Sequence, residues 1–318
     1  MALAHTAFVF PGQGSQKVGM LAAAHAEYGA VRDTFNAASE ALGYDMWDLI
    51  QHGEQDALNL TATTQPVLLT CSVALWRAWQ EQGGEAPVVM AGHSLGEFSA
   101  LVCAGALDFA DAVRLVRQRG EFMQTAVPVG EGAMAAIIGV DDEVIVDICA
   151  EVAGQGPGVV APVNFNSPGQ VVIAGHTATV DAAIAALKEA GAKRAMPLPV
   201  SAPFHTVLMK PAGERLAEAM AELAIHSPAI PVIHNVHCQA EADPERIREL
   251  LVRQIYSPVQ WTGCMQAIAE RGVSDVVECG PGKVLSGLNR RIDKSLASHS
   301  LEEPEGLQAT LTALSGGA

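Results

Sequence analysis

The chain has 318 residues, of which 49% are hydrophobic and 17% charged, which excludes a globally disordered protein and allows one large domain or two smaller ones. Its formal net charge of −16 argues against a nucleic-acid partner, because phosphate binding needs a clustered positive field. The sequence contains no apolar run of about 18 residues, which a membrane span would need, and no basic N-terminal region typical of a signal peptide. Its six cysteines form no C-x-x-C pair, so we expect a soluble cytoplasmic protein without disulfides.

The first predicted strand covers residues 6–10 and runs into a glycine-rich loop that neither regular element would continue. Helical periodicity fills much of residues 20–82, and an apolar run at 87–91 predicts a second buried strand. Gly92-His-Ser-Leu-Gly96 follows this strand directly, and apolar residues at helical spacing follow the motif. The sequence therefore predicts a strand, a sharp turn and a helix in succession.

This segment matches G-x-S-x-G, the nucleophile elbow, in which a serine on a strained turn exposes its hydroxyl above a helix N-terminus. The N-terminus of this helix supplies a backbone N–H that can bind a developing oxyanion. The alternative is a tight turn with an inert serine. Ser94 needs a base, and His205 is the candidate because its loop follows the last strand of the middle segment. A structural or solvated histidine is the competing interpretation.

The predicted helix 108–126 carries a basic residue on an apolar face. At about 100° per residue, Arg119 falls on the same side as Leu115, Val116 and Met123. A guanidinium buried there without a partner would be costly, so it needs an anion. That anion is either an internal Asp or Glu or the carboxylate of a substrate, and the sequence leaves both open.

The periodicity of apolar residues changes near residue 128. The predicted elements are strand, helix, strand, strand, helix and strand, at 133–140, 141–152, 159–165, 170–174, 177–190 and 195–200. This β-α-β-β-α-β order is that of a ferredoxin-like unit. We therefore predict that residues 128–199 are an inserted small subdomain and that residues 1–127 and 200–318 form one discontinuous α/β domain.

The last third of the chain contains predicted strands at 231–235 and 273–278 and a polar tail after Ser295. His234, His237 and Cys238 lie close together and could be metal ligands. However, a spacing of three at a strand end directs His234 and His237 to opposite faces, and no second cluster supplies further ligands. We therefore predict no metal site.

Seven segments, in the same order along residues 6–292, together resemble the malonyl-CoA:acyl carrier protein transacylase family. The segments are Phe10-Pro-Gly-Gln-Gly-Ser-Gln16, Gly92-His-Ser-Leu-Gly-Glu-Phe-Ser-Ala100, Arg119-Gly-Glu-Phe-Met-Gln124, Asn164-Phe-Asn-Ser-Pro-Gly-Gln-Val-Val-Ile-Ala-Gly175, Ser201-Ala-Pro-Phe-His205, Gln254-Ile-Tyr-Ser-Pro-Val-Gln-Trp261 and Glu278-Cys-Gly-Pro-Gly-Lys283. The resemblance implies an α/β-hydrolase-like core with an inserted ferredoxin-like subdomain.

The resemblance also implies a role for each motif residue. Ser94 would be the nucleophile and His205 its base, with Gln254 orienting His205 through its main-chain carbonyl. The implied oxyanion-hole residues are Gln13 and Leu95, and the implied substrate-binding residues are Arg119, Gln65 and Gln13.

The implied reaction moves a malonyl group from malonyl-CoA to the phosphopantetheine thiol of acyl carrier protein, through a malonyl-serine, for fatty acid synthesis. It needs no cofactor beyond its substrates. The alternatives are the same chemistry for a polyketide synthase, a serine thioesterase or hydrolase, and a non-catalytic protein that senses malonyl-CoA. Residues 271–294 hold five basic and three acidic side chains. This segment is either a docking surface for an acidic carrier or a solvated helix face without a partner, and the sequence leaves both open.

Overall fold

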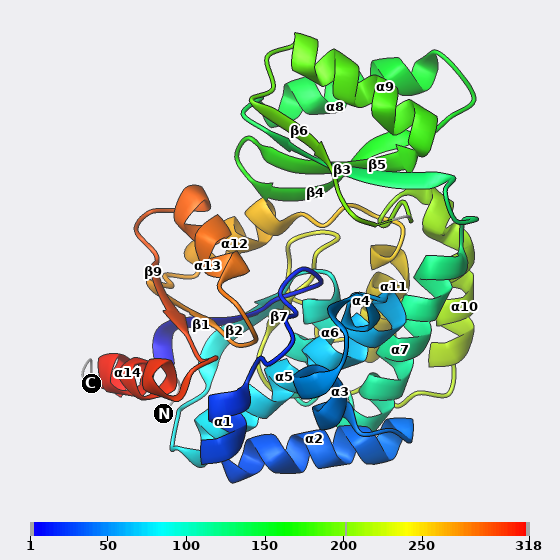
Figure 1. Ribbon diagram of the computed structural model, residues 1–318. Helices are drawn as coiled ribbons and strands as arrows, with labels where there is room; N and C mark the ends of the chain where they lie inside the picture. The colour runs from blue at the N-terminus through cyan, green and yellow to red at the C-terminus, as the bar shows by residue number, and fades with distance from the viewer. Residues whose placement is uncertain (1–2, 201, 316–318) are drawn as a thin grey trace.

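Five parallel strands form the larger of two sheets in a computed structural model, which describes residues 3–200 and 202–315 (Figure 1). Three residues used in the sequence analysis lie outside the described residues. They are Met1 and Ala2, at the N-terminus that lacks a signal peptide's basic region, and Ser201, which begins the Ser201–His205 motif. The strands in spatial order are β7 (Val232–Ile233), β2 (Pro87–Gly92), β1 (Leu3–Phe10), β8 (Asp275–Glu278) and β9 (Ala297–Ser300).

The central strand β1 shows why this sheet is buried on both faces. Phe8 and Phe10 pack into one hydrophobic cluster, whereas Ala7 and Val9 pack into another. This alternation is the two-residue period of a strand. Because helices cover both faces, the second half of the strand, residues 7–10, is fully buried and consists of apolar residues only, as is typical of parallel sheets.

The cluster around Phe8 and Phe10 includes residues of α5 (Thr61–Glu81), α6 (Leu95–Cys103) and α7 (Phe109–Thr125). Helix α5 is buried along most of its length and packs against α6 and α7. The second cluster brings α12 (Trp261–Ala269) and α13 (Val284–Ile292) against the other face. The other helical elements of this part are α1 (Ala22–Glu27), α2 (Gly29–Leu42), α3 (Met46–His52), α4 (Gln55–Leu58), a 3-10 turn (Val207–Met209), α10 (Lys210–Met220), α11 (Pro244–Gln254) and α14 (Pro304–Ser315).

A separate antiparallel sheet lies at the top of Figure 1, with α8 and α9 on its outer face. Its spatial order is β4-β5-β3-β6, and a third hydrophobic cluster lies between this sheet and its helices. The elements are β3 (Gly132–Ile138), α8 (Asp142–Gly154), β4 (Val160–Ser167), β5 (Gln170–His176), α9 (Thr177–Glu189) and β6 (Arg194–Pro197). The predicted chain order of strands and helices in this segment is therefore confirmed.

Two expectations for the C-terminal third need correction. The strand expected at 231–235 is only Val232–Ile233, because residues 234–237 turn away from the sheet. The expected polar tail instead forms β9 and α14, and its Leu301 and Leu307 are fully buried. None of the helices within the described ranges combines the length and apolar character that a membrane crossing needs.

Candidate active site

Ser94 lies on the sharp turn between β2 and α6, with φ 50° and ψ −105°. A non-glycine residue at positive φ costs about 1–3 kcal/mol and persists only where its surroundings hold it. The flanking glycines permit the bend, since a Cβ at Gly96 would lie 2.0 Å from the carbonyl oxygen of Phe10. The predicted strand, turn and helix are confirmed, and the motif glycines are required by close backbone contact.

His205 meets Ser94 although 111 residues separate them in the sequence. The Oγ of Ser94 is 2.8 Å from Nε2 of His205, and Nδ1 of His205 is 2.9 Å from the main-chain oxygen of Gln254. A carbonyl oxygen only accepts, so Nδ1 must carry the proton and donate. Nε2 is therefore the acceptor that faces the serine hydroxyl.

The environment keeps this imidazole neutral. Burial, and then the nearby positive charge of Arg119, lower the pKa of His205 to about 3. Both causes disfavour the imidazolium. At neutral pH His205 is therefore unprotonated at Nε2 and ready to accept a proton from Ser94.

Arg119 is buried, with 1% of its surface exposed, and neutral oxygens surround its guanidinium. Its Nη1 donates to Oε1 of Gln65 at 2.8 Å, and its Nη2 donates to Oε1 of Gln254 at 2.8 Å and to Oγ of Ser94 at 3.2 Å. Burial lowers the pKa of Arg119 to about 10, opposed by the negative charge of Glu97, so it stays protonated at neutral pH. Within the described ranges no carboxylate forms an ion pair with this guanidinium.

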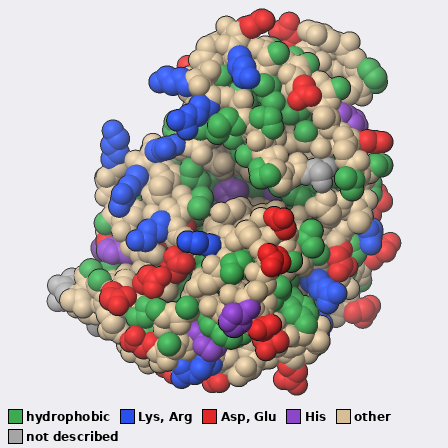
Figure 2. Space-filling model, in the orientation of Figure 1, with side chains coloured by type: hydrophobic (Ala, Val, Ile, Leu, Met, Phe, Trp, Pro, Cys, Tyr) green, Lys and Arg blue, Asp and Glu red, His purple; other side chains and the backbone are tan. Residues whose placement is uncertain are grey.

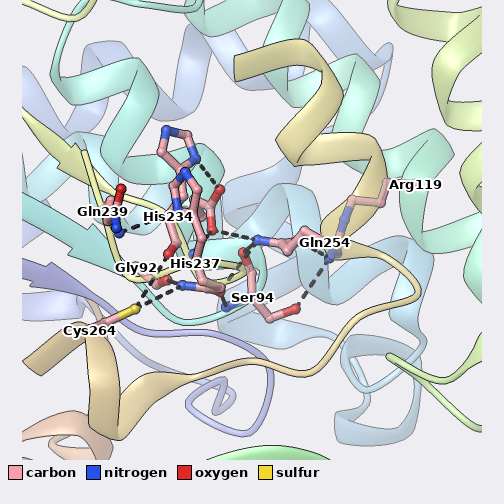
Figure 3. A network of polar contacts seen from close by, with 10 residues as sticks. Gly92, Ser94, Arg119, His234, His237, Gln239, Gln254 and Cys264 are labelled. Carbon is pink, nitrogen blue, oxygen red and sulfur yellow. Dashed lines mark hydrogen bonds and ion pairs between the residues drawn. The ribbon is translucent and has the colours of Figure 1, made fainter. Parts of the chain in front are cut away.

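Gln254, the last residue of α11, is hydrogen-bonded to Ser94, Arg119 and His205. Figure 3 shows its side chain between Ser94 and Arg119. Its main-chain oxygen accepts from His205, and its side-chain Oε1 accepts from Arg119. Its Nε2 donates to the main-chain oxygen of Ser94 and to Oε2 of Glu97, both at 3.0 Å. The family resemblance implied only the carbonyl contact of Gln254, whereas its side chain also links Ser94 to Arg119.

A cavity opens beside Ser94 between the two sheets, and polar and apolar side chains share its wall. The lining residues are Gln13, Gln65, His93, Ser94, Leu95, Arg119, Met123, Met134, Asn164, Leu198, Val200, Phe204 and His205. Every side chain expected at the site is thus on the cavity wall, except Gln254, which lies behind Ser94. Leu95 is the first residue of α6, so its N–H has no partner within that helix.

The sequence analysis missed a buried group of polar residues behind the elbow. Glu97 is fully buried in the first turn of α6, and its Oε1 accepts from Nδ1 of His234 at 2.7 Å. Its Oε2 accepts from the main-chain N of Asn235 at 2.8 Å. A carboxylate inside an otherwise apolar helix was the available signal for Glu97. For Asn235 the sequence offered no signal beyond its position between His234 and His237.

The geometric argument about His234 and His237 was wrong. Their rings contact each other edge to face, with centroids 5.9 Å apart, because β7 ends at Ile233 and the following residues form a turn. His234 is engaged with Glu97. Among the residues of the two described ranges, no group of three or more His, Cys, Asp and Glu side chains is arranged to hold a metal.

These contacts define what the site can do chemically. A hydroxyl hydrogen-bonded to a neutral imidazole is the arrangement of an activated serine nucleophile. A guanidinium 3.2 Å from the same hydroxyl can bind an anionic group carried on the acyl chain that the serine accepts. The site is therefore suited to covalent transfer of an acyl group that bears a carboxylate.

Comparison with known proteins agrees with this chemistry. Residues 7–302 match the family model described as acyl transferase domain. The chain is 60% identical over 307 residues to the malonyl CoA-acyl carrier protein transacylase of Salmonella typhimurium, covering 96% of this chain and 98% of that protein.

Two solved structures extend the likeness to the fold. One is an acyl carrier protein S-malonyltransferase from Vibrio cholerae, with TM-score 0.94, 56% identity, and coverage of 96% of this chain and 99% of that one. The other is a malonyl-transacylase in complex with a type II PKS acyl-carrier protein, with TM-score 0.95, 52% identity, and coverage of 97% and 99%.

Proposed function

The chain belongs to the acyl transferase domain family, and we propose that it transfers the malonyl group of malonyl-CoA to the phosphopantetheine thiol of acyl carrier protein for fatty acid synthesis. The similarity to named malonyl transacylases over nearly the whole chain supports this proposal. The structural observation that carries it is the buried, protonated Arg119, whose Nη2 lies 3.2 Å from the Oγ of Ser94.

In the first half-reaction Ser94 is the nucleophile. Its Oγ attacks the thioester carbon of malonyl-CoA while Nε2 of His205 takes the hydroxyl proton. A tetrahedral oxyanion forms, and we assign its binding to the main-chain N–H groups of Gln13 and Leu95. One such donor contributes about 3–4 kcal/mol at measured sites. The carbon–sulfur bond then breaks, the CoA thiol leaves with the proton from His205, and malonyl-Ser94 remains.

In the second half-reaction the carrier thiol gives its proton to His205 and attacks the ester carbon of malonyl-Ser94. The carbon–oxygen bond breaks, and the proton returns from His205 to the Oγ of Ser94. The two substrates therefore react in turn, in a ping-pong order. The carbonyl of Gln254 keeps His205 in the required tautomer throughout, and no cofactor takes part.

Arg119 supplies the preference for malonyl groups. The malonyl carboxylate would bind the guanidinium in two parallel hydrogen bonds, while Gln65 and Gln254 hold that guanidinium in place. An acetyl group would leave the buried charge without an anion, and a site built for a polar group discriminates strongly against a substrate that lacks it.

The finer fold assignment is also part of this proposal. We assign the parallel sheet and its helices to an α/β-hydrolase-like core made of residues 1–127 and 200–318. We assign residues 128–199 to a ferredoxin-like subdomain, which is supported by its β-α-β-β-α-β order and its own hydrophobic cluster. We place the protein in the cytoplasm, consistent with its free thiols.

Carrier docking is proposed at residues 271–294. Figure 2 shows Lys and Arg side chains gathered along one flank of the central hollow. The basic side chains of the segment are exposed, whereas Glu278 is fully buried, and this raises the net positive charge at the surface. Arg291 also donates to Gln170 of β5, so the segment reaches the small sheet. An acidic carrier would bind here despite the overall charge of −16.

One alternative has an observation in its favour. A structural relative was solved with a type II PKS acyl-carrier protein, so the same chemistry could serve polyketide synthesis. Transfer rates measured with fatty acid and polyketide carriers side by side distinguish the two pathways. Hydrolysis is the other alternative, and it predicts free malonate instead of malonyl carrier.

Intact-protein mass spectrometry after mixing with malonyl-CoA tests the function. We expect a malonyl adduct on the wild type, no adduct on Ser94→Ala and a weakened adduct on Arg119→Ala, with acetyl-CoA a poor donor. Added carrier should then remove the adduct and gain the malonyl mass. Free malonate without malonyl carrier would point to a hydrolase, and an absent adduct without turnover would point to a binding protein.

A further inference from the structure

We propose that Asn235 is a positioning residue that holds the strained nucleophile turn in place. The proposal rests on the assignment of Ser94 as the nucleophile. The Oδ1 of Asn235 accepts from the main-chain N of Ser94 at 2.8 Å, and its Nδ2 donates to the main-chain oxygen of Gly92 at 2.7 Å. One side-chain amide thus bridges the two residues on either side of His93.

The bridge continues the pairing between two strands beyond the point where one of them ends. Strand β2 pairs with β7 up to Ala91 and Ile233. The chain then turns at His234, so no strand backbone remains to pair with Gly92 and Ser94. The side chain of Asn235 offers one acceptor and one donor, as a strand residue would, and occupies that place.

This pairing matters because Ser94 adopts a backbone conformation that L-residues avoid. With φ 50° and ψ −105°, the turn needs surrounding contacts to persist. Without Asn235 the main-chain N–H of Ser94 would lose its hydrogen-bond acceptor. A small relaxation of the turn would then move Oγ away from Nε2 of His205, which now lies 2.8 Å away.

The amide of Asn235 is itself fixed on every side. The residue is fully buried, its main-chain N donates to Glu97, and its main-chain oxygen accepts from the N of Gln260 at 3.2 Å. Glu97 also accepts from His234 and Gln254, and Figure 3 shows these two side chains beside the turn. The amide cannot flip, since its Nδ2 would then face the N–H of Ser94 and its Oδ1 would face the carbonyl of Gly92.

Asn235 does not line the cavity, and among the described residues it makes no hydrogen bond to Arg119 or Gln65. Its Oδ1 also accepts from Nε2 of Gln254, at the longer distance of 3.4 Å. Its loss should therefore slow every reaction of the Ser94 hydroxyl by the same factor, whatever the acyl group. A change at Arg119 has the opposite signature, because it alters the preference between malonyl and acetyl donors. This difference separates positioning of the nucleophile from recognition of the substrate.

The test measures Ser94 acylation in single turnovers of the full chain, with malonyl-CoA, acetyl-CoA and phenylmethanesulfonyl fluoride. The sulfonyl fluoride reacts with Ser94 without needing the acyl-binding groups. The Oγ of Ser94 forms a bond to sulfur, fluoride leaves, and His205 takes the hydroxyl proton. For Asn235→Ala we expect the three rate constants to fall together by about 10–100-fold, the scale of a small misplacement of reacting groups. The half-saturating malonyl-CoA concentration should stay within about twofold of the wild-type value, since the proposal leaves binding unchanged.

Asn289→Ala is the matched control. Asn289 is also fully buried and accepts a hydrogen bond at Oδ1, from Trp261, but it makes no hydrogen bond to Gly92, His93 or Ser94 among the described residues. It lies on α13 within the proposed carrier segment, and the acylation assay contains no carrier. We expect this control to lower the unfolding midpoint without slowing acylation. Asn235→Ser keeps a single polar group at the position and should lie between wild type and Asn235→Ala. It also provides the measurement if Asn235→Ala does not fold.

Several outcomes would overturn the proposal: wild-type rates in both Asn235 variants, an equal loss in Asn289→Ala, or a loss confined to malonyl-CoA. Failure of the proposed function looks different. The wild type would then react with the sulfonyl fluoride but form no malonyl adduct, and the sulfonylation rates would still measure the role of Asn235.

Discussion

The Nη2 of Arg119 lies 3.2 Å from the Oγ of Ser94. The side chain proposed to bind the malonyl carboxylate therefore also contacts the oxygen to which the malonyl group is transferred. The same Arg119 charge lowers the pKa of His205. Recognition and reactivity are therefore coupled through one guanidinium, and substitutions at Arg119 should affect both.

Arg119→Lys should lose most malonyl transfer although it keeps a positive charge. A lysine presents a point charge instead of a planar fork, so it cannot hold a carboxylate in two hydrogen bonds while also bonding Gln65 and Gln254. We expect kcat/KM for malonyl-CoA to fall by about 100-fold or more, a loss of about 3 kcal/mol, and the value for acetyl-CoA to change far less. Steady-state kinetics with both donors provide the check, and an equal fall for both would argue against carboxylate recognition by Arg119.

The acid limb of the pH profile should depend on Arg119. His205 acts as a base only when unprotonated, and its pKa of about 3 keeps it active well below the ordinary histidine range. Removing the Arg119 charge takes away the second cause of this lowering, so the pKa of His205 rises and the acid limb moves toward neutral pH. Sulfonylation of Ser94 measured against pH in Arg119→Ala tests this shift.

Arg117→Ala is the control for that experiment, because Arg117 lies on the same helix but is exposed and paired with Glu121. Its acid limb should match the wild type. An Arg119→Ala profile identical to the wild type, or moved to lower pH, would contradict the electrostatic coupling.

Gly96→Ala should destabilise the protein, since the added Cβ would lie 2.0 Å from the carbonyl oxygen of Phe10. Overpacking of this kind costs about 1–3 kcal/mol, and the clash is with backbone that cannot move aside cheaply. Gly287→Ala on α13 is the control, because its Cβ would meet nothing within 4 Å. In a helix this change should stabilise by about 0.5–1 kcal/mol. Urea unfolding measures both, and a fully stable Gly96→Ala would be inconsistent with the close contact.

Reversing Arg290 and Arg291 to Glu should raise the KM for carrier protein and leave the KM for malonyl-CoA unchanged. Both side chains are exposed at the end of α13, and rim charges chiefly affect association rate and its salt dependence. The matched control reverses Arg114 and Arg117, which are exposed on α7 and change the net charge equally. Equal effects of the two double reversals would mean that total charge, not a local surface, governs carrier binding.

The local part of the site was predictable because its signals are short-range. The strand before Ser94, the glycines around it and the apolar face bearing Arg119 each follow from periodicity or turn chemistry. The pairing of Ser94 with His205 was inferred from the position of His205 after the last strand of the middle segment and from the family resemblance, since spacing carries no information across 111 residues.

Asn235 and the Gln254 side chain were beyond such reasoning. Their roles depend on which strands become neighbours in the sheet. A hydrogen bond between a loop amide and a distant turn produces no pattern in the sequence from which it could be predicted. The same limit explains the C-terminal errors, since residues 297–300 look polar but pair with β8 as an edge strand.

The order of strands in the large sheet has a consequence for synthesis on the ribosome. Strand β1 emerges first, yet its neighbours are β2 on one side and β8 on the other. At typical elongation rates, on the order of 5–20 residues per second, residues 275–278 follow β1 by roughly 15–55 seconds. After β2 has been made, β1 can pair with β2 but not yet with β8, so one of its hydrogen-bonding edges stays unpaired until residues 275–278 emerge. An unpaired strand edge can pair with other chains, so we expect chaperone binding to the nascent chain to fall within this window.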